Sequence, residues 1–333
     1  MSKKIRIGSR KSRLAVIQTE ELVSYIKRQC PKMQPQIVTI ETTGDRRLDV
    51  SLEKIGGKGL FVKEIDRALL DGAVDLAVHS LKDMPMEECG DIPIVGFSQR
   101  EDARDVLVLP EGEEAWDGRG IIGCSSFRRR IQAEKLFPDA QFRPIRGNVP
   151  TRLEKLDGGG YDALILAAAG LKRLGLEKRI SRYFSPEEIL PAAGQGILAV
   201  QGRAGKDYSF LAGFGTFETA MAAKAERAFV RSLGGGCSSP VAAYAKVRGG
   251  ELHLNGLYYR ERDYFFVIGS KSGPAHEAER KFAGTGASRQ IWRRNDIVTR
   301  KRRKSWERKK LYNMFRKDCL SFRMQSIKSF IQS

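Results

Sequence analysis

The sequence has few of the residues that bind metals or form disulfide frameworks. It contains three histidines and five widely spaced cysteines among 333 residues, with no CxxC pair. These absences argue against a zinc site and against a disulfide-rich secreted fold, so we expect no metal and a reducing compartment. No apolar run approaches the length of a membrane span, and the first residues lack the apolar segment of a signal peptide. We therefore expect a cytoplasmic protein that does not enter a membrane.

Acidic residues are scarce towards the C-terminal end. Residues 281–333 hold 16 Lys and Arg but only 3 Asp and Glu, which accounts for +13 of the net charge of +19. The arginines of the remaining chain stand singly in loops and do not form the basic, aromatic-lined stripe typical of nucleic-acid binding. This distribution favours small anionic ligands. Only the tail supports an alternative RNA-binding role, which a steep salt dependence of binding would reveal.

Hydrophobic periodicity predicts an α/β fold with two similar units. Strands are expected at 5–7, 36–41, 74–78, 121–123, 142–145 and 163–166, separated by helices that include 12–28. Strand-like runs at 92–97, 105–109 and 197–201 predict two crossings between the units, and the third run returns to the first sheet. Ligands of such sheets bind at the carboxyl ends of the strands, so we expect a cleft between two lobes. Hinges are predicted at Gln99–Asp102 and Pro191–Gly196, on position alone.

A smaller α+β domain is predicted to follow the two lobes. It consists of a helix over 217–232 and three antiparallel strands over 241–247, 251–258 and 264–270. The expected division is residues 1–98 and 196–214 for lobe 1, 102–191 for lobe 2, 217–283 for domain 3, and 284–333 for an atypical basic tail. We expect the tail to be disordered or loosely docked and dispensable for chemistry. Truncation near Gly284 tests this hypothesis, which a complete loss of folding would contradict.

Two loops have residues suited to ligand chemistry. Ser125 or Ser126 opens a predicted helix whose first turn carries Arg128 and Arg129, so free N–H groups and guanidinium groups together favour a carboxylate or phosphate. The glycine-rich loop 234–240 presents Cys237, where a thiol is more often reactive than structural. Taken alone, each arginine is more often a surface charge, and the loop is more often a turn with an incidental thiol.

Several motifs in order along the chain resemble the porphobilinogen deaminase (hydroxymethylbilane synthase) family. They are Gly8-Ser-Arg10-Lys-Ser12, Gly56-Gly-Lys58-Gly-Leu-Phe61, Val78-His-Ser80-Leu-Lys82-Asp83-Met-Pro85, Ser125-Ser126-Phe-Arg128-Arg129, Arg146-Gly-Asn148-Val, Ala169-Gly-Leu-Lys-Arg173-Leu-Gly175, Ala193-Gly-Gln195-Gly196 and Gly235-Gly-Cys237. The resemblance covers residues 5 to about 280. It implies two lobes similar to type-2 periplasmic binding proteins with a double crossover, plus a small third domain.

The resemblance also implies an activity and a set of site residues. The activity is a transferase reaction of haem biosynthesis, in which four porphobilinogen molecules condense stepwise to hydroxymethylbilane with release of ammonia. The implied cofactor is a dipyrromethane held by a thioether on Cys237, and Asp83 is the implied catalytic residue. The implied cofactor and substrate contacts are Arg10, Ser12, Lys58, Ser80, Lys82, Ser125, Ser126, Arg128, Arg129, Arg146, Gly147, Asn148, Arg152, Ala169, Arg173 and Gln195.

The chemistry of these residues fits the implied reaction. A growing pyrrole chain carries an acetate and a propionate on each ring, and arginines neutralise such carboxylates with paired hydrogen bonds. A carboxylate under the pyrrole N–H groups stabilises the cation that forms when ammonia leaves. Without the resemblance, Lys82 and Asp83 would more often be a solvated ion pair, and His79 a packed residue at a strand end. The alternative function is a non-catalytic anion-binding protein of the periplasmic-binding-protein type. We expect a monomer that binds no nucleic acid.

Four departures from the family pattern affect the site or the tail. Cys124 stands where the family often has Thr, so a second thiol near the cleft would compete with Cys237. Arg13 and Pro150 replace residues of other types beside predicted contacts. Residues 284–333 lack the amphipathic stripe of the family's final helix.

Overall fold

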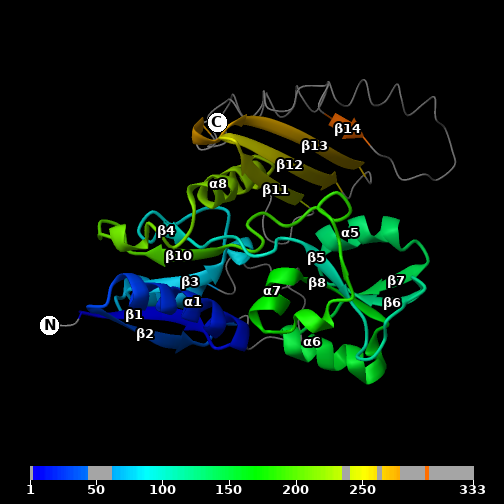
Figure 1. Cartoon of the computed structure of the whole chain (residues 1–333), viewed down its shortest axis with the longest axis horizontal. Coiled ribbons are helices and arrows are strands. Elements are labelled where there is room, and N and C mark those ends of the chain that lie inside the picture. The colour runs from blue at the N-terminus through cyan, green and yellow to red at the C-terminus, as the bar shows by residue number, and fades with distance from the viewer. Residues whose placement is uncertain (1–2, 44–61, 235–240, 261–264, 278–296, 300–333) are drawn as a thin grey trace.

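Two five-stranded sheets in the lower part of Figure 1 are built on the same plan. The structure, a computed structural model, describes residues 3–43, 62–234, 241–260, 265–277 and 297–299. One sheet has the strand order β2-β1-β3-β10-β4 and the other the order β7-β6-β8-β5-β9. In each sheet the first three strands are parallel, and the fourth pairs antiparallel with both of its neighbours. The two predicted α/β units are therefore present, and each sheet is mixed.

The first lobe is built from two segments of the chain, one before and one after the second lobe. Its elements are β1 (Lys3–Arg10), α1 (Arg13–Gln29), β2 (Met33–Ile40), α4 (Lys63–Leu70), β3 (Leu76–Ser80), the 3₁₀ turn η1 (Leu81–Asp83), β4 (Ile94–Phe97) and β10 (Leu198–Gly202), followed by the turn η4 (Ser209–Leu211). Strand β10 returns to this sheet, as the run at 197–201 predicted. It pairs antiparallel with β3, so β3 has one parallel and one antiparallel neighbour.

The second sheet lies entirely between the two crossings. Its elements are β5 (Asp105–Val108), β6 (Gly120–Gly123), α5 (Phe127–Leu136), β7 (Ala140–Arg143), α6 (Val149–Lys155), the π turn η2 (Leu156–Gly160), β8 (Ala163–Ala167), α7 (Ala168–Arg173), the turn η3 (Glu177–Arg179) and β9 (Arg182–Tyr183). Helix α1 of the first lobe contacts α7 of the second.

Local signals fix the ends of the longer helices. The Ser12 hydroxyl accepts a hydrogen bond of 3.3 Å from the Ala15 N–H, which satisfies a donor that the first turn of α1 leaves unpaired. The buried face of α1 includes Thr19, Leu22 and Ile26. Thr216 caps α8 in the same way, with 3.1 Å from the Thr219 N–H to the hydroxyl.

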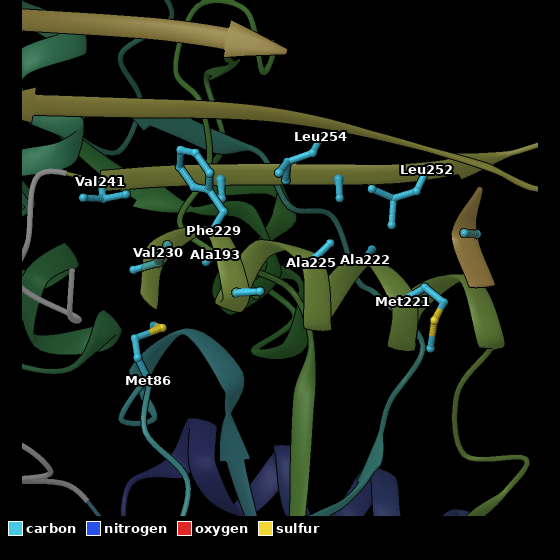
Figure 2. Packing of buried hydrophobic residues seen from close by; sticks show 14 residues of the cluster. Met86, Ala193, Met221, Ala222, Ala225, Phe229, Val230, Val241, Leu252 and Leu254 are labelled. Atoms are coloured by element: carbon cyan, nitrogen blue, oxygen red, sulfur yellow. The ribbon is translucent and has the colours of Figure 1, made fainter. Parts of the chain in front are cut away.

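Domain 3 packs α8 against an antiparallel sheet (Figure 2). Its elements are α8 (Phe217–Ser232), β11 (Val241–Arg248), β12 (Glu251–Arg260), β13 (Phe265–Pro274), the turn η6 (Ala275–Glu277) and β14 (Ile297–Thr299). Phe229 of α8 lies over β12, where a Cβ on Gly256 would come within 2.4 Å of the Phe229 ring. Burial of a phenylalanine stabilises a fold by about 1.5–3 kcal/mol, so this glycine permits a favourable contact.

The sheet of domain 3 is wider than expected. The three predicted strands are present, and β14 adds a short fourth strand by pairing with β13. Strand β14 lies within the predicted tail, and the rest of residues 284–333 lies outside the described residues. Within the described part of the chain, no helix combines the length and hydropathy that a membrane span requires.

Both crossings are attached to domain 3 through one buried carboxylate. Glu226 of α8 is fully buried and accepts two hydrogen bonds of 2.8 Å from Arg100 Nη2 in the first crossing. Its Oε2 also accepts 2.7 Å from the Gly194 N–H in the second crossing, and its Oε1 accepts 2.6 Å from the Ala245 N–H of β11. Burial raises the pKa of Glu226, while Arg100 and the two N–H groups favour the carboxylate. The predicted hinge segments therefore share a fixed point.

Candidate active site

Asp83 lies in a short turn that is fixed on both sides by buried residues. Strand β3 ends at Ser80, and η1 follows with Leu81 and Met84 buried. The Leu81 N–H donates a hydrogen bond of 3.0 Å to the carbonyl of Ile197, at the end of the second crossing. The Asp83 side chain itself is exposed at the carboxyl end of the strand. The turn therefore presents a carboxylate on a rigid base.

Lys82 lies beside this carboxylate and beside groups of the other lobe. Its Nζ donates a hydrogen bond of 3.5 Å to Oε1 of Gln195 in the second crossing. Burial lowers the pKa of Lys82 to about 8, with Arg128 and Arg129 adding to this effect and Asp83 and Asp105 opposing it. The ammonium form therefore predominates at neutral pH, and it is lost within the mildly alkaline range.

Arg128 and Arg129 belong to the first turn of α5, but their charges are already compensated. Both are buried, at 5% and 8% exposed, and Ser126 caps the helix by accepting a hydrogen bond from the Arg129 N–H. Arg128 Nη1 lies 2.7 Å from Oδ2 of Asp105, and Arg129 Nε and Nη2 lie 2.9 and 2.8 Å from its Oδ1. The two arginines of the predicted anion-binding helix are thus already paired with a buried carboxylate of strand β5.

Asp105 is a residue of this site that was not predicted from the sequence. It is 0% exposed, and it begins the apolar strand β5. Burial alone would raise the pKa of this carboxyl, but Arg128 and Arg129 hold the pKa well below its usual range. A charged residue at the start of a continuously buried strand is a signal for a buried ion pair, because an unpaired carboxylate there would be very costly. The partners cannot be read from that signal.

The loop before α6 brings a second group of predicted residues close to Arg129 and Asp83. Asn148 caps α6 and accepts 3.0 Å from the Thr151 N–H, and Gly147 has a φ of 111°. Arg152 Nε donates 2.8 Å to the Gly147 carbonyl. Burial lowers the pKa of Arg152, and Arg129 adds to this effect. Pro150 occupies the first turn of α6, where proline is well tolerated, so this departure leaves the helix intact.

The predicted serines are used within the fold. Ser12 and Ser126 cap helices, as described above. The Ser125 hydroxyl donates a hydrogen bond of 2.5 Å to the carbonyl of Ile145 and accepts one of 2.9 Å from the N–H of the same residue. The Ser80 hydroxyl accepts 3.0 Å from Nε2 of Gln18. These hydroxyls hold the loops in shape, and whether they also contact a ligand stays a prediction.

Two further predicted residues connect the lobes. Arg173 Nε lies 2.7 Å from Oε1 of Glu21 on α1, and Arg173 Nη2 donates 3.1 Å to the Gly196 carbonyl. Gln195 is buried and donates from Nε2 to the Ala103 carbonyl at 2.7 Å and to Asp105 Oδ1 at 2.9 Å. Both side chains therefore join segments that are distant in the sequence.

The remaining predicted residues divide into described and undescribed ones. Arg10 lies at the end of β1, and Ala169 is buried in α7. Lys58 and Cys237 lie outside the described residues. Cys124 is buried, and burial raises the pKa of its thiol, which disfavours the reactive thiolate that would compete with Cys237. His79 is also buried, and burial lowers its pKa to about 4, as expected of a packed residue.

The structure brings the charged candidates of both lobes into one electrostatic cluster. Lys82 is influenced by Asp83, Arg128 and Arg129, and Arg152 is influenced by Arg129, Arg146 and Asp83. Positive groups outnumber carboxylates in this cluster, and the exposed carboxylate is that of Asp83. Such a cluster can bind a ligand with several carboxylates and can stabilise a positive charge beside Asp83. Among the described residues, no group of three or more His, Cys, Asp or Glu is arranged to hold a metal ion.

Comparisons with known proteins identify relatives over most of the chain. Residues 5–210 match the family described as "Porphobilinogen deaminase, dipyromethane cofactor binding domain", and residues 220–264 match "Porphobilinogen deaminase, C-terminal domain". The chain is 56% identical to the porphobilinogen deaminase of Ruminiclostridium cellulolyticum, over 78% of this chain and 88% of the relative. It is 54% identical to that of Acetivibrio thermocellus, over 83% of this chain and 94% of the relative. The second substrate-binding domain of a putative amino-acid ABC transporter from Streptococcus pneumoniae is similar over 70% of this chain and 95% of its own, with 13% identity and a TM-score of 0.40.

Proposed function

The chain belongs to the porphobilinogen deaminase family, and from this premise we propose how its own residues carry out the family's reaction. The reaction is a transferase reaction of tetrapyrrole and haem biosynthesis. Four porphobilinogen molecules condense stepwise into linear hydroxymethylbilane, ammonia leaves at each step, and the primer is a dipyrromethane cofactor. Membership of this family does not favour our alternative of a non-catalytic anion-binding protein.

The charges in the cleft fit such a cofactor and substrate. The dipyrromethane is built from two porphobilinogen units, so it carries acetate and propionate groups that need cationic partners. Lys82, Arg128 and Arg152 would hold these carboxylates by charge-assisted hydrogen bonds, as would the other predicted contacts around them. When bound, the cofactor supplies the pyrrole carbon to which the first substrate is added. Its proposed attachment to Cys237 makes each later addition effectively intramolecular.

Asp83 is the proposed catalytic residue. The observation that carries this proposal is its exposed carboxylate on a rigid turn, next to a cluster of guanidinium groups that would hold the ligand. Loss of ammonia leaves positive charge on the pyrrole ring, and a carboxylate beside the ring N–H stabilises that charge. The guanidinium groups fix the ring by its side-chain carboxylates and leave the N–H groups for Asp83. Binding and charge stabilisation are thus assigned to different residues.

The intact mass of the purified protein tests the covalent part of the proposal. We expect a mass increase of two pyrrole units in the wild-type chain. Cys237→Ser is expected to abolish the adduct, and the matched Cys124→Ser variant is expected to retain it because Cys124 is a buried thiol. A wild-type protein that is active without an adduct would refute the proposed attachment, and an adduct retained in Cys237→Ser would move it to another residue.

We also propose the finer organisation expected from the sequence. The chain acts as a cytoplasmic monomer that binds no nucleic acid, with lobe 1 formed by residues 1–98 and 196–214, lobe 2 by 102–191 and domain 3 by 217–283. Light scattering after size exclusion tests the oligomeric state, and a stable dimer at micromolar concentration would contradict a monomer. RNA binding by the purified protein that weakens steeply with added salt would contradict the expectation that the chain binds no nucleic acid.

A further inference from the structure

Asp105 occupies the centre of a polar chain that runs from one lobe to the other. Its two oxygens accept hydrogen bonds from Arg128 and Arg129 on the side of the second lobe. Its Oδ1 also accepts from Gln195, which belongs to the second crossing. Gln195 in turn accepts from Lys82, which precedes Asp83 in the first lobe. One buried carboxylate is therefore linked to the proposed ligand-binding arginines and to the turn of the proposed catalytic residue.

The orientation of the Gln195 amide depends on this carboxylate. Nε2 of Gln195 has two acceptors on its side, Asp105 Oδ1 at 2.9 Å and the Ala103 carbonyl at 2.7 Å. An amide whose nitrogen is fixed by two acceptors must direct its oxygen the other way. That oxygen accepts from Lys82 Nζ at 3.5 Å. The charge on Asp105 therefore influences the position of Lys82 without touching it.

The same carboxylate determines how the two arginines point. Arg129 contacts Asp105 through Nε and Nη2, and its Nη1 donates a hydrogen bond of 3.2 Å to the Ile165 carbonyl. Arg128 Nη1 donates hydrogen bonds of 2.7 Å both to Asp105 and to the Leu190 carbonyl. Two adjacent guanidinium groups repel each other, and a shared carboxylate is what allows both to be buried. Removal of its charge would leave two buried cations without a counter-ion.

We propose that Asp105 is a positioning residue for the reaction, which sets the geometry of Arg128 and Arg129 and, through Gln195, that of Lys82. It contacts none of the reacting atoms. Its role is to hold the cationic groups of both lobes in one arrangement before the polyanionic ligand arrives. This inference rests on the proposed function, because only that function gives the cationic cluster a ligand.

Asp75, whose side chain is less buried than that of Asp105, provides a control with the same pairing to two arginines. Asp75 also accepts from two arginines, with 3.0 Å to Arg6 Nη2 and 3.2 Å to Arg203 Nη2, and it lies in the first lobe outside the cationic cluster. Asp75→Asn and Asp105→Asn therefore both remove a carboxylate that two arginines share. A purely structural role of Asp105 predicts that both variants lose stability and keep the kinetic constants of the wild type.

The experiment compares kcat, KM and the pH dependence of kcat/KM for the holoenzymes with porphobilinogen. For Asp105→Asn we expect KM to rise about tenfold, the equivalent of about 1.4 kcal/mol in binding. The alkaline limb of the pH profile should also move about one unit lower, because Lys82 loses an attractive charge while Arg128 and Arg129 still repel it and Asp83 is unchanged. Asp75→Asn should change neither quantity.

Asp105→Glu keeps the charge and displaces it by one methylene group. It is expected to retain the wild-type alkaline limb and to raise KM, and it supplies the test if Asp105→Asn does not fold. Kinetic constants of Asp105→Asn that match those of Asp75→Asn would overturn the proposal, and so would a wild-type KM in Asp105→Glu. A wild-type protein that makes no hydroxymethylbilane would instead refute the proposed function, so the two failures are distinguishable.

Discussion

Replacement of Glu226 by glutamine tests the claim that one carboxylate fixes both crossings. The side chain is 0% exposed, and both of its oxygens accept a hydrogen bond of 2.8 Å from Arg100 Nη2. Each oxygen also receives one backbone N–H, from Gly194 at 2.7 Å and from Ala245 at 2.6 Å. All of these partners are donors, so the site needs two acceptor oxygens. Glutamine supplies only one, and its NH₂ group would face donors.

The size of the effect follows from burial. Breaking a buried ion pair by removing one charge costs about 3–5 kcal/mol, because the remaining charge stays buried without a partner. Arg100 keeps one further hydrogen bond, 3.1 Å from Nη1 to the Ala245 carbonyl, which limits but does not cancel the loss. We therefore expect Glu226→Gln to lower the free energy of unfolding by about 3–5 kcal/mol.

Urea denaturation followed by circular dichroism measures this loss. Asp71→Asn is the control, since it removes the carboxylate of the exposed Arg67–Asp71 pair, whose atoms lie 3.5 Å apart. Exposed pairs of this kind contribute about 0.2–1 kcal/mol, so the control should be close to wild type. A Glu226→Gln variant whose loss is no larger than that of Asp71→Asn would refute the reasoning, and the crossings would then need another fixed point.

Three further outcomes follow from the site. Asp83→Asn should bind porphobilinogen yet lower kcat about 10²–10³-fold, whereas the exposed Glu87→Gln in the same loop should not; near-normal turnover would remove Asp83 from the mechanism. The wild-type kcat/KM should fall as pH rises through about 8, because Lys82 then loses the proton that gives it its charge, and a flat profile to pH 10 would contradict this. Gly147→Ala should lower the free energy of unfolding by about 1–3 kcal/mol, because φ at Gly147 is 111° and the new Cβ would lie 2.8 Å from Thr151 Cγ2. Gly158→Ala is the control, because the position of its new Cβ is open. Equal stabilities of the two variants in urea denaturation would contradict the predicted strain.

The sequence predicted the elements well where local chemistry decides them. The helix over 217–232 has the predicted bounds, because its capping threonine and its alanine-rich apolar face are local features. The strand at 197–201 was assigned to the first sheet, since a crossing has to return there. The strand runs antiparallel to β3, and hydrophobic periodicity alone does not show the direction of a strand in its sheet.

The charge balance of the candidate site was not predicted from the sequence. The arginine-rich loops indicated an anion-binding cleft, and the structure places Arg128, Arg129 and Arg152 in one cluster. Their partners were not predictable, because Asp105 is separated from Arg128 by 23 residues, and Glu226 from Arg100 by 126. Ion pairs of this separation depend on the tertiary fold, and no local pattern records them. The lowered pKa of Lys82 likewise depends on burial and on charged groups of the other lobe, which come together only in the tertiary fold.

The buried carboxylates change how an arginine motif should be interpreted. A cleft for a polyanion needs excess positive charge, but the ligand-free protein must tolerate the repulsion that this charge creates. Asp105 relieves it for Arg128 and Arg129, and Glu21 relieves it for Arg173. Among the described residues, Arg152 hydrogen-bonds to a carbonyl and not to a carboxylate, and burial with repulsion from Arg129 lowers its pKa. A ligand carboxylate therefore gains most at Arg152, because there it compensates a charge that the fold leaves uncompensated.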